Sequence, residues 1–333
     1  MSTAIGYETH NHLDQHYLVV TKSITDGRLV FFLGAGASLY GRPNGAAWHG
    51  RYLPSAKELA EHLADTYGFA PRGCPNCERA DLLRVSQYAA GTAGWGGLYG
   101  DLHKIFNFDY PFTSLHHFLA ILPRLLREKG CKKDKLLVVT TNYDDLMERA
   151  FVGAGEEVDV VTYMAEGEHR GMCLHWPPKT EAQLIDKPNA YPGSLLEARS
   201  VVLKIHGAVN RKSAQVEDDS YVITEDDYIE YLAHATDVAK VLPAVLVAKL
   251  KESHVLFLGY SLRDWNLRAI LYRIWEKERF KFRSWAIQSH PDSLERRSWS
   301  KRNVDIVDEE LDDYVDKLRK RIENLHLSAS QAA

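Results

Sequence analysis

The chain has 333 residues, of which 45% are hydrophobic and 26% charged, the proportions of an ordinary globular protein. No apolar run approaches the roughly 18 residues of a membrane-spanning helix, and a formal net charge of −4 gives no general attraction to nucleic acid. Four cysteines in a chain of this size do not suggest a disulfide scaffold. The amino terminus lacks a signal pattern, so we expect a cytoplasmic protein with no direct binding to nucleic acid or membrane.

Short apolar runs predict a buried sheet. In chain order they are residues 29–33, 136–139, 158–162, 201–205, 255–258 and 285–287. The runs are continuously apolar rather than alternating, which is typical of parallel strands covered by helices on both faces. We therefore expect an α/β fold: a Rossmann-like parallel sheet flanked by helices, with a mostly helical insertion at about 55–130.

Helical signals lie between these runs. They are two capping-box patterns, Ser55 with Glu58 and Thr224 with Asp227, and two apolar stripes, in residues 113–130 and 311–325. A proline inside the first stripe, Pro123, should kink its helix. Residues 311–325 should form a terminal helix.

Glycine- and proline-rich intervals predict irregular structure. Residues 91–100, GTAGWGGLYG, are expected to be a flexible loop within the insertion. Residues 164–197 are expected to be a long loop that serves as a lid or stays disordered. We assign residues 28–325 to one domain, between an N-terminal segment, 1–27, and a short tail, 326–333.

The N-terminal segment holds a group of potential metal ligands. His10, His12 and His16 lie near Asp14. A mobile, solvated terminus explains them better than a metal site, because chain ends are seldom ordered unless they are tied down.

Small and polar residues follow four of the strands. They are Gly34-Ala35-Gly36-Ala37-Ser38, then Thr140-Thr141-Asn142-Tyr143-Asp144-Asp145, then His206-Gly207, and last Gly259-Tyr260-Ser261. The carboxyl ends of parallel strands line one crevice, so all four groups should face the same ligand. Glycines there can bring main-chain N–H groups to a pyrophosphate, with Ser38 adding a hydroxyl.

Each group also has an explanation without a ligand. Glycines at a strand end permit close packing, and Asp144 is well placed to cap the following helix. Ser261 and Asp264 have capping-box spacing. Asn142 lies earlier than a cap and could hold a ribose hydroxyl or a water. A strand-end histidine such as His206 can be a satisfied core residue, but it is also well placed for proton transfer near neutral pH.

The blocks GAGAS, TTNYDD, KIHG and FLGYS, in this order, resemble the signature blocks of the sirtuin superfamily over about residues 28–290. The chain looks most similar to the sirtuin-like NAD⁺ hydrolases of bacterial anti-phage defence. This resemblance implies an NAD⁺ glycohydrolase that cleaves the nicotinamide–ribose bond and depletes the cofactor during infection.

The resemblance also implies roles for the strand-end residues. Asn142 would position water or the nicotinamide-side ribose, His206 would act as general base, and Asp144 would orient the same region. NAD⁺, as the substrate, would be bound by Gly34, Ala35, Gly36, Ser38, Thr141, Gly259 and Ser261.

Three alternatives rank below the NAD⁺ hydrolase, beginning with the protein-deacylating sirtuins. Those enzymes carry a four-cysteine zinc ribbon, whereas this chain has one C-x-x-C, at Cys74 and Cys77, with Cys131 and Cys173 distant. No metal is therefore expected, and an NAD⁺-dependent deacylase is the second hypothesis. The third is a module that senses NAD⁺ or ADP-ribose without turnover. A dehydrogenase ranks lower because the G-x-G-x-x-G fingerprint is incomplete.

Unregulated NAD⁺ hydrolysis would harm the host, so the resemblance implies gating. The expected partners are further copies of the same chain, a regulatory sensor, or an ATPase.

Overall fold

The computed structural model describes residues 2–43, 45–70, 73, 78–193, 195–211, 218–234, 241–262, 265–275 and 280–325, with side chains described from residue 13 onward except at 234, 265 and 266. Within these ranges a nine-stranded sheet has the order β11-β10-β9-β1-β2-β6-β3-β4-β5. Neighbouring strands from β11 to β3 are parallel, and β4 and β5 join antiparallel. The predicted α/β fold is confirmed.

The strands of this sheet include all six predicted runs. Their bounds are β1 Leu29–Leu33, β2 Leu137–Thr140, β3 Val158–Tyr163, β4 Cys173–Trp176, β5 Gln183–Ile185, β6 Ser200–Lys204, β9 His254–Leu258, β10 Ser284–Gln288 and β11 Val304–Asp308. A separate two-stranded sheet pairs β7, Gly207–Ala208, with β8, Ser220–Tyr221.

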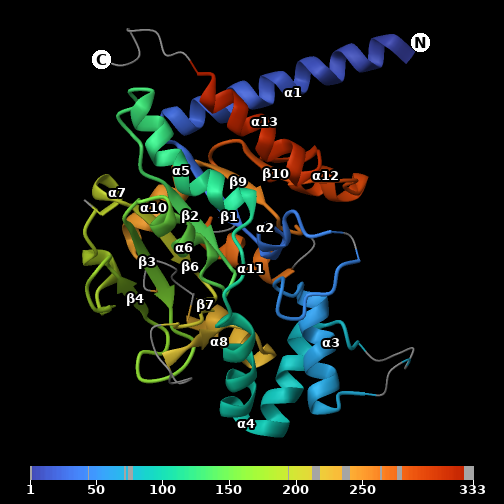
Figure 1. Cartoon of the computed structure of the whole chain (residues 1–333), viewed down its shortest axis with the longest axis vertical. Coiled ribbons are helices and arrows are strands. Elements are labelled where there is room, and N and C mark those ends of the chain that lie inside the picture. Colours follow the sequence, from blue (N-terminus) through green and yellow to red (C-terminus); the bar gives the residue numbers. More distant parts are fainter. Residues whose placement is uncertain are drawn as a thin grey trace.

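Helices cover both faces of the large sheet (Figure 1). The first face packs on α1 Ser2–Thr25, α5 Ser114–Glu128, α6 Leu146–Gly153 and α13 Leu311–Glu323. The second packs on α8 Glu225–His234, α10 Ala244–Lys251, α11 Trp265–Ile274 and α12 Ser293–Ser300. Within β1, Phe31 belongs to the first core cluster and Phe32 to the second. Burial on both faces explains why the strands are continuously apolar.

Helices also fill the insertion between β1 and β2. After the short α2, Ala35–Leu39, come α3 Ala56–Tyr67 and α4 Leu82–Phe106, and then α5. The predicted capping box at α3 is confirmed, with Ser55 and Glu58 exchanging side-chain and main-chain hydrogen bonds. The C-x-x-C at Cys74 and Cys77 lies outside the described residues.

The expected loop at residues 91–100 is wrong, because these residues lie within α4. The helix changes direction at Gly94, whose φ of 72° and ψ of 167° are not helical. On the carboxyl side of this kink, Leu98, Tyr99 and Leu102 are buried in a third core cluster that also holds Tyr221 of β8. Burial of these side chains outweighs the low helix propensity of the glycines.

The expected irregular loop at residues 164–197 is also wrong. It contains β4, β5, the 3₁₀ turn η1, Pro188–Ala190, and the short helix α7, Leu195–Ala198. Cys173 of β4 is buried, and its Sγ lies 3.3 Å from the carbonyl oxygen of Val241. Through β4 and β5, part of the interval therefore extends the sheet.

The N-terminal segment forms α1, whose carboxyl-terminal half packs on the sheet through Tyr17, Val20 and Ile24. The His16 ring packs edge-on against Trp285, and its Nε2 lies 2.9 Å from the Tyr314 hydroxyl. Burial lowers the pKa of His16 to about 4, and Asp14 pairs with Arg321. The side chains of His10 and His12 lie outside the described residues, as does the tail 326–333.

Two further helices match their sequence signals. Asp227 accepts hydrogen bonds from the main-chain N–H groups of Ile223 and Thr224, and its own N–H donates to the Thr224 hydroxyl at the start of α8. The helix α5 includes Pro123. In the described ranges, no helix is both long and apolar enough to cross a membrane.

Candidate active site

A cavity of about 520 Å³ lies at the carboxyl ends of β1, β2, β6 and β9. Of the ten predicted site residues, nine line it: Ala35, Gly36, Ser38, Thr141, Asn142, Asp144, His206, Gly259 and Ser261. The tenth, Gly34, lies behind the wall, where its carbonyl oxygen accepts a hydrogen bond from Asn142. The four strand-end groups therefore meet around one cavity, within the volume range of small-molecule sites.

Asn142 is held at the cavity wall by its side-chain nitrogen. The Nδ2 atom lies 3.1 Å from the carbonyl oxygen of Gly34 and 3.2 Å from Ser38 Oγ. Its main-chain N–H donates to the hydroxyl of Thr140 at 3.0 Å. These contacts join the end of β2 to the turn after β1, so the amide does not cap α6.

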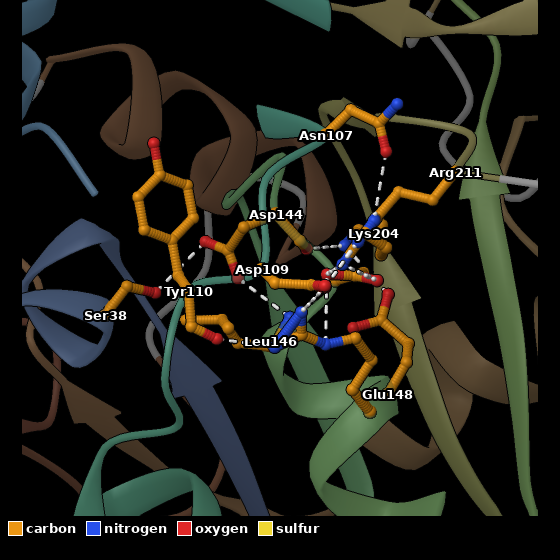
Figure 2. Close-up of polar contacts among 11 residues, drawn as sticks. Ser38, Asn107, Asp109, Tyr110, Asp144, Leu146, Glu148, Lys204 and Arg211 are labelled. Carbon is orange, nitrogen blue, oxygen red and sulfur yellow. Dashed lines mark hydrogen bonds and ion pairs between the residues drawn. The ribbon is translucent and has the colours of Figure 1, made fainter. Parts of the chain in front are cut away.

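Asp144 lines the cavity and also contacts the start of α6, whose N-cap residue is Asp145. Its Oδ1 accepts a hydrogen bond from the main-chain N–H of Leu146 at 3.1 Å, in the first turn of α6. Its Oδ2 accepts one from Ser38 Oγ at 3.0 Å (Figure 2). The serine hydroxyl in turn lies beside Asn142, so one short chain of contacts links three of the predicted residues.

His206 follows β6 and is 3% exposed. Its Nδ1 lies 3.3 Å from the hydroxyl of Tyr228, and its Nε2 is buried without a hydrogen-bond partner in the described part of the chain. Burial lowers the pKa of His206 to about 3. The imidazole is therefore neutral throughout the physiological range, whereas the sequence placed its proton transfer near neutral pH.

The glycines at the strand ends allow two turns to approach closely. A Cβ on Gly36 would lie 2.8 Å from the carbonyl oxygen of Gly259, and one on Gly34 would lie 2.5 Å from the Tyr260 ring. The N–H groups of Gly34 and Gly36 donate to the carbonyl oxygens of Leu258 and Gly259. Close packing, the explanation that needs no ligand, accounts for both glycines.

Apolar and aromatic side chains form much of the remaining wall, and of these only Tyr143 and Tyr260 belong to the predicted strand-end groups. The apolar and aromatic residues are Leu53, Pro54, Ala56, Leu59, Leu82, Phe106, Tyr143, Tyr228 and Tyr260. Several come from the insertion, and no local motif marks them as neighbours of the strand ends. Tyr228 follows the predicted Thr224–Asp227 cap directly, and that cap was the signal that could have placed it near His206.

The turn after β1 is also supported from α5, and this support predicts a pH dependence. Thr113 Oγ1 donates to the carbonyl oxygen of Ala37 at 3.1 Å and lies 2.7 Å from Nδ1 of His116. Burial lowers the pKa of His116 from 6.5 to about 4. Below pH 6.5 the unfolded chain takes up this proton and the folded chain does not, so stability present above pH 6.5 is lost as the pH falls toward 4.

His116→Gln should therefore weaken the acid sensitivity of folding. Glutamine preserves the capping-box pattern with Thr113 and does not titrate. Between pH 6.5 and 4, the wild type should lose on the order of 3 kcal/mol more free energy of unfolding than the variant does. Urea denaturation at a series of pH values measures this difference, and parallel pH profiles for the two proteins would contradict it.

Comparisons with known proteins identify the family. A family model described as a SIR2-like domain matches residues 136–307, more than half of the chain, so the protein belongs to the SIR2-like family. The matched range includes TTNYDD, KIHG and FLGYS, but the GAGAS block precedes it. The resemblance to sirtuins inferred from these blocks is confirmed.

Individual relatives are distant. Defense-associated sirtuin 2 of Bacillus subtilis is 22% identical over 293 residues, which are 87% of this chain and 24% of that protein. The present chain thus spans about a quarter of this relative's length. A solved SIR2 homolog–NAD complex is 16% identical, with a TM-score of 0.32, over 91% of this chain and 92% of that one.

Proposed function

We propose that the protein hydrolyses NAD⁺ to nicotinamide and ADP-ribose in the cavity at the strand ends. The observation that carries this proposal is the meeting of Asn142, Asp144 and His206, from two strand ends, at a single cavity whose buried His206 Nε2 has no partner among the described residues. A buried nitrogen without a partner is costly unless a ligand or water satisfies it. Membership of the SIR2-like family makes NAD⁺ the substrate of choice.

The reaction requires orientation more than strong acid or base. When the bond between nicotinamide and ribose breaks, nicotinamide leaves as a neutral molecule and positive charge develops on the ribose. A water oxygen then bonds to the ribose carbon and releases one proton. His206 would accept that proton, because its imidazole is neutral at working pH, but burial lowers its pKa to about 3 and makes it a weak base, so orientation of the water is its main contribution.

The remaining residues would bind and orient the substrate. Asn142, fixed by Gly34 and Ser38, would present a rigid amide to the nicotinamide-side ribose or to the water. Asp144 would hold the Ser38 hydroxyl in place. The described residues that line the cavity include no lysine or arginine, so the hydroxyls of Thr141 and Ser261, and main-chain N–H groups other than those of Gly34 and Gly36, would meet the diphosphate.

A role in anti-phage defence extends this proposal. Its support is the name of the relative, Defense-associated sirtuin 2, together with the chemistry, since NAD⁺ loss stops the metabolism that a phage needs. Gating by self-assembly, a sensor or an ATPase remains part of the proposal, as does a cytoplasmic location.

Incubation of the purified chain with NAD⁺ tests the proposed reaction. Chromatography should show nicotinamide and ADP-ribose in equal amounts, with no requirement for an acetyl-lysine peptide. Nicotinamide release only when the peptide is present would favour the deacylase. Binding of NAD⁺ by calorimetry, with no product at any enzyme concentration, would contradict hydrolysis by the chain alone or by its self-assembly and would favour the sensing module.

A further inference from the structure

Lys204, the last residue of β6, is a buried cation beside the candidate site. Its side chain is 1% exposed. The ammonium donates to the main-chain carbonyl oxygen of Asp144, and it lies 2.8 Å from Oε1 of Glu148 in α6 (Figure 2). The lysine thus emerges from one strand and binds the turn that follows the neighbouring strand.

This arrangement is an inefficient way to stabilise a fold. Removing an ammonium and a carboxylate from water costs several kcal/mol per ion, and well-packed apolar side chains often serve stability as well or better. The pair is also incompletely satisfied, since Glu148 Oε2 is buried and has no hydrogen-bond partner in the described ranges. Stability alone therefore gives a poor account of a lysine at this position.

The geometry around Asp144 gives a better account. Residues 141–145 form the turn between β2 and α6, and they carry Asn142 and Asp144 into the cavity. The Asp144 carboxylate holds Ser38, and Ser38 contacts Asn142. The ammonium of Lys204 binds the main-chain carbonyl oxygen of the same residue, Asp144. Asp144 is therefore held at its carboxylate by Ser38 and at its carbonyl oxygen by Lys204. We call the contact from Lys204 the Lys204 clamp, and it sets where the Asp144 side chain points.

We propose that Lys204 is a positioning residue for the proposed NAD⁺ hydrolysis, acting through the main-chain carbonyl of Asp144 on the orientation of Asp144, Ser38 and Asn142. This inference rests on the proposed function. Lys204 does not line the cavity at the strand ends. Loss of the clamp should misplace the reacting groups without removing any of them.

The informative variant replaces the whole pair, Lys204→Met with Glu148→Met. Lys204→Met alone would leave a buried carboxylate without a partner, which can unfold the chain. The double variant removes both charges and fills similar volume, so its free energy of unfolding should equal or exceed that of the wild type. Its kcat should fall about 10- to 100-fold, the scale of a displacement of about 1 Å in a site, with KM changed less than about threefold.

A second lysine supplies a matched control. Lys249 is partly buried and donates to the main-chain carbonyl oxygen of Gly27 at 2.5 Å, at the end of β1 away from the cavity. Lys249→Met removes an equivalent lysine-to-carbonyl bond and should leave kcat within about twofold of the wild type, because no reacting group depends on it.

Amide hydrogen exchange separates this proposal from the proposed function. In the double variant, exchange should accelerate for the amides of residues 142–146 and stay unchanged in β9 and β10, whether or not the protein turns over NAD⁺. If the wild type does not hydrolyse NAD⁺, the proposed function fails, and local acceleration still supports the clamp. Unchanged exchange in residues 142–146, or a kcat of the double variant equal to that of the wild type, would overturn the proposal that Lys204 positions Asp144. A free energy of unfolding below that of the wild type, with faster exchange throughout the double variant, would assign Lys204 a structural role and also overturn the proposal.

Discussion

His206→Ala or Asn142→Ala should lower the turnover of NAD⁺ by about 10²- to 10⁴-fold, the usual range for the loss of an acid–base or positioning group. Both side chains line the cavity, and neither is part of the hydrophobic core clusters. His206→Ala removes the buried imidazole that would accept the proton. Asn142→Ala removes the amide that links the turns after β1 and β2.

Nicotinamide release, measured together with thermal unfolding, checks this result. His254→Ala is the control. His254 is the first residue of β9, at the amino ends of the strands and away from the cavity, so the variant should retain full activity. The wild-type rate should also be flat between pH 5.5 and 8, because burial lowers the pKa of His206 to about 3 and keeps it neutral there. Near-full activity in both alanine variants would remove these residues from the mechanism.

The sheet could be predicted from the sequence because its central strands are buried on both faces. Such strands read as unbroken apolar runs, and each of the six runs became a strand. The strand β11 was missed because Val304 and Ile306 alternate with Asp305 and Val307 at the edge of the sheet, where burial is one-sided. The strands β4 and β5 were missed for a similar reason, as short antiparallel additions at the other edge.

The location of the site followed from one topological rule, while its chemistry required coordinates. Parallel strands end at the same edge of a sheet, so residues 34–38, 140–145, 206–207 and 259–261 were expected to converge, and members of all four groups line one cavity. Burial could not be predicted, and it changes the expected behaviour of His206. The Lys204 clamp could not be predicted either, because nothing in KIHG indicates that its lysine is buried against the turn after β2.

Gly259→Ala should destabilise the protein by about 2–5 kcal/mol, more than the same substitution at a glycine in an ordinary turn. Gly259 has a φ of +66°, and a Cβ there would lie 2.1 Å from the main-chain nitrogen of Ala37. A side chain in the left-handed region costs roughly 1–2 kcal/mol, and forcing backbone apart in a packed site costs roughly 1–3 kcal/mol more. The added methyl group would therefore separate the turn after β9 from the turn after β1.

Gly68→Ala isolates the conformational part of that cost. Gly68 ends α3 with a φ of +72°, and a Cβ there would meet no atom within 4 Å. Its substitution should cost about 1–2 kcal/mol in urea denaturation, with NAD⁺ binding unchanged. Gly259→Ala should cost more and should also weaken NAD⁺ binding, because the displaced Gly36 and Ser38 line the cavity. Equal costs for the two substitutions would mean that the turns after β1 and β9 do not approach as closely as the glycines suggest. That result would contradict the cavity wall that these two turns form together.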